Sequence, residues 1–349
     1  MHRHWNRIAA VILALTPLAA FPQDRTEPRP DSAVAAVLAA FGRFPVVALG
    51  MQHQQQDEAD FSLRLIRSPG FAAAVNDIVI ECGNPLYQRV LDRYIARESV
   101  DAEQLSQVWR NTTQPGRCEP RQHRELLDAV RELNRQLPRA RKLRVLAGDS
   151  PIDWAVVRTS ADVQRFLNAR DSAFASVVNE QVLAKHRKAL LVIGAAHIMR
   201  QPITWRAEPT PAAITATGII ERAHPHTTFV IVPHDGFGNQ LPAYEARMAA
   251  WPKPSLVLLR GTWLGAVSGK TIFADNVRRV GGDPKVFDDP YFGFNLEDLA
   301  DAYLYLGPLA SLTSVQWPDI SGTAYGKEVE RRNGLIGMRA GPAPLRVPR

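Results

Sequence analysis

Six short apolar runs, separated by stretches in which apolar residues have helical spacing, most constrain how this chain can fold. The runs are rich in valine, isoleucine and leucine, which is typical of strands buried on both faces. Strands that alternate with helices form a mostly parallel sheet covered by helices on both faces. We therefore expect an α/β fold, with strands at residues 45–50, 77–81, 143–147, 188–194, 228–233 and 255–260. Residues 302–306 are either an edge strand or a helical turn.

The interval between the second and third expected strands is too long for a single crossover helix. Helical spacing recurs in it, at residues 87–94, 105–109 and 119–137, so we expect a helical insert after strand two. No linker divides the chain further. The sequence predicts a signal peptide at 1–20, a disordered leader at 21–31, a single α/β domain at 32–340 and a flexible tail at 341–349.

The N-terminus has the pattern of a secretory signal. Arg3 and Arg7 precede an apolar run at residues 8–15, and the small residues Ala19 and Ala20 follow it. This run is too short to span a membrane, and no cysteine near it offers a site for a lipid anchor. We expect cleavage near Ala20 and a periplasmic or secreted protein that keeps no stable membrane anchor.

The two cysteines agree with export. Cys82 and Cys118 could form one disulfide in an oxidising compartment. Cys82 could equally be a small buried residue at the end of a strand. The sequence leaves both interpretations open.

The charge pattern bears on the kind of partner. The formal net charge is +7, but the basic residues are spread along the chain rather than clustered. A nucleic-acid-binding protein would show a basic patch, so we expect no nucleic-acid partner. A small molecule or a peptide is the expected substrate.

Ionisable side chains occur at the C-terminal ends of five expected strands. They are His53, Glu81, Asp149, His197 and His234. In a parallel sheet these ends share one edge, where ligands of open α/β sheets bind. We therefore expect a functional site at this edge, with Asp149, His234 and the neighbouring Met51 as binding residues.

The residue types permit two forms of hydrolytic chemistry. His53 could activate water as a general base, with Glu81 orienting it and His197 stabilising the developing oxyanion. The same three side chains could instead bind a divalent metal ion. The chain has no G-x-S-x-G, H-E-x-x-H, C-x-x-C or phosphate-loop motif, which disfavours serine hydrolases and nucleotide enzymes.

Most of these residues also have a structural interpretation. A histidine can be satisfied within the core, and Asp149 could cap the turn that follows its strand. Arg170 and Asp171 are interpreted as a structural ion pair near the same edge. Glu81 is the strongest candidate, because a carboxylate at the end of a buried strand is costly without partners.

Three segments together resemble the erythromycin esterase-like/ChaN-like superfamily, which also includes Tiki and TraB proteins. They are Leu49–His53, the strand that ends in Glu81, and the run from Leu190 to His197. The resemblance covers residues 40–200. It implies that His53 is the general base, Glu81 the essential carboxylate and His197 the second histidine of the site.

Members of this superfamily include hydrolases that open a macrolide ester, metal-dependent peptidases and haem-binding lipoproteins. The resemblance therefore implies an exported hydrolase of ester or amide bonds, with haem or small-ligand binding as the alternative. For haem, Met51, His53 or Tyr303 could supply the axial ligand. Met51 also stands where many members have a glutamate, so a scaffold without activity is the third interpretation.

Overall fold

Eight strands form a single sheet in the order β1-β7-β8-β6-β2-β5-β3-β4. The computed structural model describes residues 25–119, 121–202, 214–234, 240–271 and 293–337. The predicted signal peptide at 1–20 and the predicted tail at 341–349 lie outside the described residues. The strands are β1 (Asp31–Ser32), β2 (Val46–Met51), β3 (Asp77–Ile80), β4 (Arg144–Ala147), β5 (Ala189–Gly194), β6 (Thr228–Pro233), β7 (Ser255–Leu258) and β8 (Ala302–Tyr305).

The sheet is mostly parallel, which confirms the predicted fold class. β2 pairs in parallel with β5 and β6, β3 with β4 and β5, and β6 with β8. Only β7 reverses the direction, pairing antiparallel with both β8 and β1. The segment expected to be an edge strand or a helical turn is β8, an internal strand. Its four residues are at most 1% exposed, as a strand covered on both faces requires.

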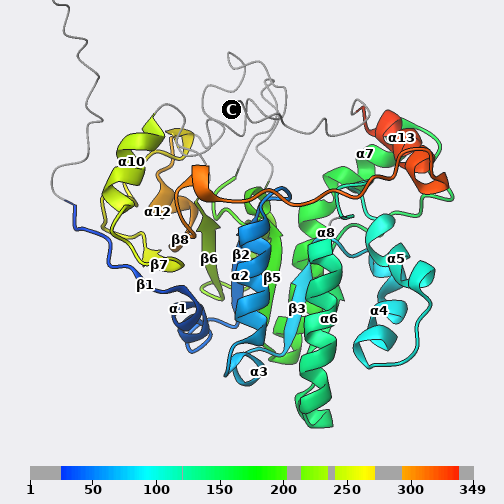
Figure 1. Ribbon diagram of the computed structural model, residues 1–349, viewed down its shortest axis with the longest axis horizontal. Coiled ribbons are helices and arrows are strands. Elements are labelled where there is room, and N and C mark those ends of the chain that lie inside the picture. Colours follow the sequence, from blue (N-terminus) through cyan, green and yellow to red (C-terminus); the bar gives the residue numbers. More distant parts are fainter. Residues whose placement is uncertain (1–24, 120, 203–213, 235–239, 272–292, 338–349) are drawn as a thin grey trace, which may run out of the picture.

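Helices cover both faces of the sheet, so side chains of one strand pack alternately into two cores. In β2, Val46 and Ala48 join the core under α8, α9, α10 and α12, whereas Val47 and Leu49 join the core under α1 to α6. Figure 1 shows α2 and α6 lying across the front of the strands. The helices are α1 (Ala33–Ala40), α2 (Gln56–Arg67), α3 (Phe71–Ala74), α4 (Gln88–Ile95), α5 (Ala102–Arg110), α6 (Arg121–Gln136), α7 (Ser160–Asn168), α8 (Arg170–Val177), α9 (Ala216–Ala223), α10 (Leu241–Met248), α12 (Leu296–Leu299) and α13 (Ala324–Ile336).

The helical insert expected after the second predicted strand, which is β3 in the structure, consists of α4, α5 and α6. At the outer edge of the sheet, the side chain of Gln88 in α4 pairs with β4. Its Nε2 donates to the carbonyl of Val145 at 2.8 Å, and its Oε1 accepts from the N–H of Ala147 at 2.8 Å. A side-chain amide thus pairs with one acceptor and one donor on the open side of the edge strand.

The second half of the expected disordered leader is fixed on the sheet. The N–H of Thr26 donates to the carbonyl of Gly261, and the N–H of Trp263 donates to the carbonyl of Thr26. The indole N–H of Trp263 also donates to Glu27 at 2.7 Å. The segment that begins at Arg25 therefore packs against the rest of the domain. Within the described ranges, the helices are too short or too polar to cross a membrane.

Gly83 allows the turn after β3 to pack directly on β4. A Cβ atom at this position would lie 2.8 Å from Cα and 2.9 Å from Cβ of Ala147. Gly83→Ala is therefore expected to lower the free energy of unfolding by about 1–3 kcal/mol, measured by urea denaturation. The control is Gly334→Ala in α13, where a new Cβ meets nothing within 4 Å. That change should be neutral or stabilising, and a larger loss there than at Gly83 would contradict the packing argument.

Candidate active site

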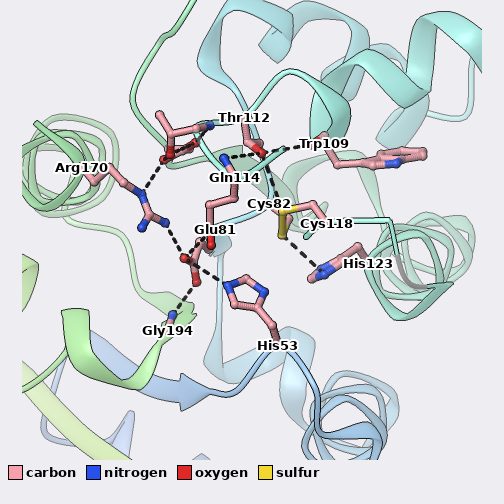
Figure 2. Close-up of a disulfide and its surroundings, with 12 residues drawn as sticks. His53, Glu81, Cys82, Trp109, Thr112, Gln114, Cys118, His123, Arg170 and Gly194 are labelled. Carbon is pink, nitrogen blue, oxygen red and sulfur yellow. Dashed lines mark hydrogen bonds and ion pairs between the residues drawn. A yellow bond between two sulfur atoms is a disulfide. The ribbon is translucent and has the colours of Figure 1, made fainter. Parts of the chain in front are cut away.

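Glu81 is the centre of a polar group at the C-terminal ends of β2, β3 and β5. It follows β3 directly, and its side chain is 5% exposed. Gln114 Nε2 and Arg170 Nη2 each donate to Oε1 at 2.5 Å, while the N–H of Gly194, at the end of β5, donates to Oε2 at 2.5 Å. Figure 2 shows these donors converging on the carboxylate from different elements. A Cβ at Gly194 would lie 3.3 Å from Oε2, so glycine permits the close approach of the backbone.

These neighbours keep Glu81 ionised. Burial alone would raise the pKa of Glu81, but its neighbours His53, Arg170 and His197 lower it by more. The pKa therefore lies well below its usual range. The carboxylate can accept hydrogen bonds but has no proton to donate at neutral pH.

Arg170 supplies the buried positive charge of the site. Besides Glu81, it contacts the fully buried Asp149, whose Oδ1 accepts from Nε at 3.1 Å. The N–H and hydroxyl of Thr113 donate to the same carboxylate at 2.5 and 2.9 Å. Burial would lower the pKa of Arg170, but Asp149 and Glu81 raise it, so the guanidinium stays charged. Arg170 thus holds two buried carboxylates in place.

The contacts of His197 fix its tautomer. Arg170 Nη1 lies 3.1 Å from Nε2, and because arginine only donates, this nitrogen must accept. Nδ1 therefore carries the proton, which it donates to Asp171 Oδ1 at 2.9 Å. The N–H of Ala216 also donates to Asp171 at 2.8 Å. Both nitrogens of His197 are thus engaged.

His53, by contrast, presents an open nitrogen. Its Nε2 lies 3.6 Å from Glu81 Oε1, within ion-pair range and longer than a standard hydrogen bond. Because Glu81 only accepts, Nε2 of the neutral imidazole carries the proton, and the lone pair is on Nδ1. Nδ1 is buried and has no hydrogen-bond partner among the described residues. Figure 2 shows the ring between Glu81 and His123.

His53 lines a small cavity of about 20 Å³, which is room for about one water molecule. Its lining combines polar and apolar side chains. The lining residues are Met51, His53, Ile80, Glu81, Cys82, His123, Leu126 and Val192.

The cysteines form a disulfide at the wall of this cavity. Cys82 is bonded to Cys118, which settles the two interpretations left by the sequence. Cys82 Sγ lies 3.4 Å from Nε2 of His123 on α6. Burial and the neighbouring His53 lower the pKa of His123 to about 3, so this imidazole is neutral at physiological pH.

Four of the predicted site residues converge, with Arg170 linking them. It contacts Glu81, Asp149 and His197 directly, and His53 lies against Glu81. The sequence interpretation of Arg170 and Asp171 as a structural pair missed this role. Their adjacency at the start of a helix was the only signal.

Of the other two predicted binding residues, His234 lies away from the site and Met51 lines its cavity. His234 is buried in a second cluster, where Nδ1 contacts the hydroxyl of Tyr303 at 2.5 Å and Nε2 contacts Glu245 at 3.0 Å. Met51 lines the cavity, and its sulfur accepts from the hydroxyl of Ser62 at 3.9 Å. No sequence motif marks Gln114 or His123, which the helical insert brings to the site.

The donors available for a metal differ from the predicted set. Both nitrogens of His197 are engaged, so ligation through His53, Glu81 and His197 would require its contacts with Arg170 and Asp171 to break. Within the described ranges, the histidine, cysteine and carboxylate side chains whose donor atoms lie within 4.8 Å of one another are His53, Cys82 and His123. The sulfur of Cys82 is at present part of the disulfide.

The lowered pKa of Glu81 predicts a pH dependence of stability. A depressed carboxyl pKa stabilises the folded state above the ordinary value of 4.5, and this contribution is lost as the pH falls through the folded-state value. Glu81→Gln should therefore lose less stability than the wild type when the pH is lowered below 4.5. Urea denaturation over a pH series measures both slopes. Identical slopes would contradict the assignment of a depressed pKa to Glu81.

A buried carboxylate and a histidine thus lie at the C-terminal edge of a mostly parallel sheet. Comparison with models of known families and with curated proteins finds no match. Among solved structures, a protein from Bacillus cereus is 12% identical, with a TM-score of 0.53 over 84% of this chain and 97% of that chain. A protein described as a succinoglycan biosynthesis protein is 10% identical, with a TM-score of 0.53 over 84% of this chain and 96% of that chain.

A mutant of erythromycin esterase EreC in its open conformation is also similar. It is 13% identical, with a TM-score of 0.52 over 82% of this chain and 94% of that chain. At such identities the likeness concerns the fold alone. The chain has the erythromycin esterase-like fold that the sequence resemblance implied.

Proposed function

We propose that this protein is a hydrolase of ester or amide bonds in which His53 is the general base. Two observations on His53 carry the proposal: its buried Nδ1 has no hydrogen-bond partner among the described residues, and its side chain lines a cavity the size of one water molecule. A general base must lie within hydrogen-bond reach of the proton that it removes. The similarity to an erythromycin esterase supports the same class of reaction.

The proposed reaction begins with a water molecule in this cavity. As the water oxygen attacks the carbonyl carbon of the substrate, Nδ1 of His53 takes up one of its protons. The imidazolium that forms is stabilised by the Glu81 carboxylate next to Nε2. When the tetrahedral intermediate collapses, the proton on Nδ1 passes to the leaving alcohol or amine.

The rest of the polar group positions Glu81. Gln114, Arg170 and the N–H of Gly194 hold the carboxylate, and Asp149 holds Arg170. These contacts fix the carboxylate before the substrate binds, so its reorganisation adds little to the barrier. Within this proposal, Arg170 is a positioning residue.

The cellular location of the protein is also part of the proposal. We infer that the protein works outside the cytoplasm, in the periplasm or secreted. The signal pattern of residues 1–20 and the Cys82–Cys118 disulfide support this, because disulfides persist in oxidising compartments. Detection of the protein lacking residues 1–20 in the periplasmic or culture fraction would test it.

The test of the proposed activity is turnover of a panel of small ester and amide substrates by the purified protein. We expect the wild-type protein to hydrolyse at least one ester, and the His53→Gln variant to lose that activity. Adding a chelator distinguishes the general-base reaction, which should persist, from the metal-dependent one. Full activity in His53→Gln would contradict the proposed mechanism.

Haem binding is the alternative function. The sequence offers Met51, His53 and Tyr303 as candidate axial ligands, and their surroundings differ. Tyr303 is fully buried and its hydroxyl contacts His234, so it is not an open axial ligand. Met51 and His53 remain, both in the wall of the small cavity. A Soret band that appears on adding haem and is lost in His53→Gln would favour this function over hydrolysis.

A further inference from the structure

Cys82 lies beside two histidines in the wall of the His53 cavity. Its sulfur is 3.4 Å from His123 Nε2, and one nitrogen of each imidazole lies within 4.8 Å of the sulfur and of the other ring. All three residues line the same cavity of about 20 Å³. A thiolate and two imidazoles are a ligand set suited to zinc.

We propose that reduction of the Cys82–Cys118 disulfide creates a Zn²⁺ site whose ligands are Cys82, His53 and His123. In the disulfide, the sulfur of Cys82 is uncharged and a weak ligand. A small dithiol would reduce the bond to two thiols and would itself be oxidised to a cyclic disulfide. Zn²⁺ then displaces the thiol proton of Cys82 and binds the thiolate.

The spacing of the donors fits such a site after small movements. Zinc–nitrogen and zinc–sulfur bonds of 2.0–2.3 Å place the ligand atoms of a tetrahedral site about 3.3–3.7 Å apart. Cys82 Sγ and His123 Nε2 already lie 3.4 Å apart. His53 lies in the turn after β2 with its side chain 20% exposed, so its ring is the part that can move towards them.

The hydrogen bonding of His53 also suits a metal ligand. Nδ1 is the buried nitrogen without a partner among the described residues, and it carries the lone pair. Nε2 on the far side of the ring faces the Glu81 carboxylate. Zinc-binding histidines usually donate their second N–H to a carboxylate in this way, which fixes the ring and strengthens the ligand.

The three ligands do not depend on Cys118 for their positions. Cys82 follows β3, and the backbone just beyond it is held by the hydrogen bond from Asn84 N–H to the carbonyl of Val108 at 2.8 Å. His123 belongs to α6, which packs on α2 and α4. Cys118 lies in the segment between α5 and α6. Breaking the disulfide therefore leaves β3 and α6, the elements that position Cys82 and His123, packed as they are.

Zinc at this site would occupy the lone pair of His53 Nδ1. The consequence for catalysis rests on the proposed function, because it assumes that this lone pair removes a proton from water. Under that assumption, the reduced, zinc-loaded protein lacks its base. Zinc binding itself is independent of any activity, so the two are tested separately.

The test is metal binding by two variants that both lack the disulfide. Cys118→Ser leaves the Cys82 thiol beside the histidines, whereas Cys82→Ser removes it. Titration with Co²⁺ should give a thiolate-to-cobalt charge-transfer band in Cys118→Ser alone, and Zn²⁺ should abolish the band. We expect Cys118→Ser to bind Zn²⁺ at least about 100-fold more tightly than Cys82→Ser, since even loss of a supporting contact weakens metal sites by up to that factor.

Two further measurements make the result decisive. Wild-type protein should bind Zn²⁺ tightly after treatment with a dithiol and weakly before it. Adding His123→Gln to Cys118→Ser should weaken Zn²⁺ binding by at least about 10-fold while the circular dichroism spectrum stays that of the folded protein. Equal affinities in the two serine variants, or loss of the folded spectrum in Cys118→Ser, would overturn the proposal.

Discussion

Replacing Arg170 with methionine is expected to lower the free energy of unfolding by about 3–5 kcal/mol, the usual effect of leaving a buried charge without its partner. Arg170 contacts both Glu81 and Asp149, whose side chains are 5% and 0% exposed. Methionine has a similar volume but no charge, so the change isolates the electrostatic contribution. Urea denaturation at neutral pH measures the loss.

The control for this prediction is Arg187→Met. Arg187 also contacts a fully buried carboxylate, donating to both oxygens of Asp77 at 2.7 Å. Its own side chain is 30% exposed, however, and Asp77 keeps the two hydrogen bonds from Arg144. We expect a loss of only about 1–2 kcal/mol. Equal losses in the two variants would mean that Arg170 is no more than an ordinary ion-pair partner.

His53→Gln is expected to lower kcat/KM for the best ester substrate by about 10²–10⁴-fold, the range that general-base catalysis contributes. Glutamine preserves a polar side chain of similar size but has no basic nitrogen to accept a proton from water. The loss should appear in kcat rather than in KM, because the proton is transferred only as the transition state forms. Steady-state kinetics of the folded variant provide the measurement.

The matched comparison for the kinetic prediction is His197→Gln. Both nitrogens of His197 are engaged, one accepting from Arg170 and the other donating to Asp171. His197 therefore acts on the reaction only by positioning Arg170, and the expected loss is less than about 10-fold. Losses of the same size in both histidine variants would assign His197 a direct part in the chemistry.

The convergence of the strand ends followed from the sequence, because it depends on local patterns. Apolar runs predicted parallel strands, and parallel strands bring their C-terminal ends to one edge. This was enough to place His53, Glu81 and Asp149 near one another. It was not enough to assign Arg170, because its partner Glu81 is 89 positions away and nothing in the local sequence connects them.

The residues from the helical insert show a second limit. Gln114 lies between α5 and α6, and His123 lies in the first turns of α6. The periodicity of α6 identifies its apolar face but not the strand end against which that face packs. Strand direction is hidden for a similar reason, since the buried run of β7 has the same pattern in either orientation. Tertiary packing determines both the strand end that α6 packs against and the direction of β7.

The Gln88 amide that pairs with β4 bears on how copies of this protein meet one another. An uncovered outer strand is a template on which another chain can add, and such additions lead to polymers and aggregates. At Val145 and Ala147 the acceptor and donor that an incoming strand would use are already taken. The side chain of Gln88 thus occupies the positions at which the backbone of an added strand would pair with Val145 and Ala147. At these positions, self-association through β4 would first have to displace it.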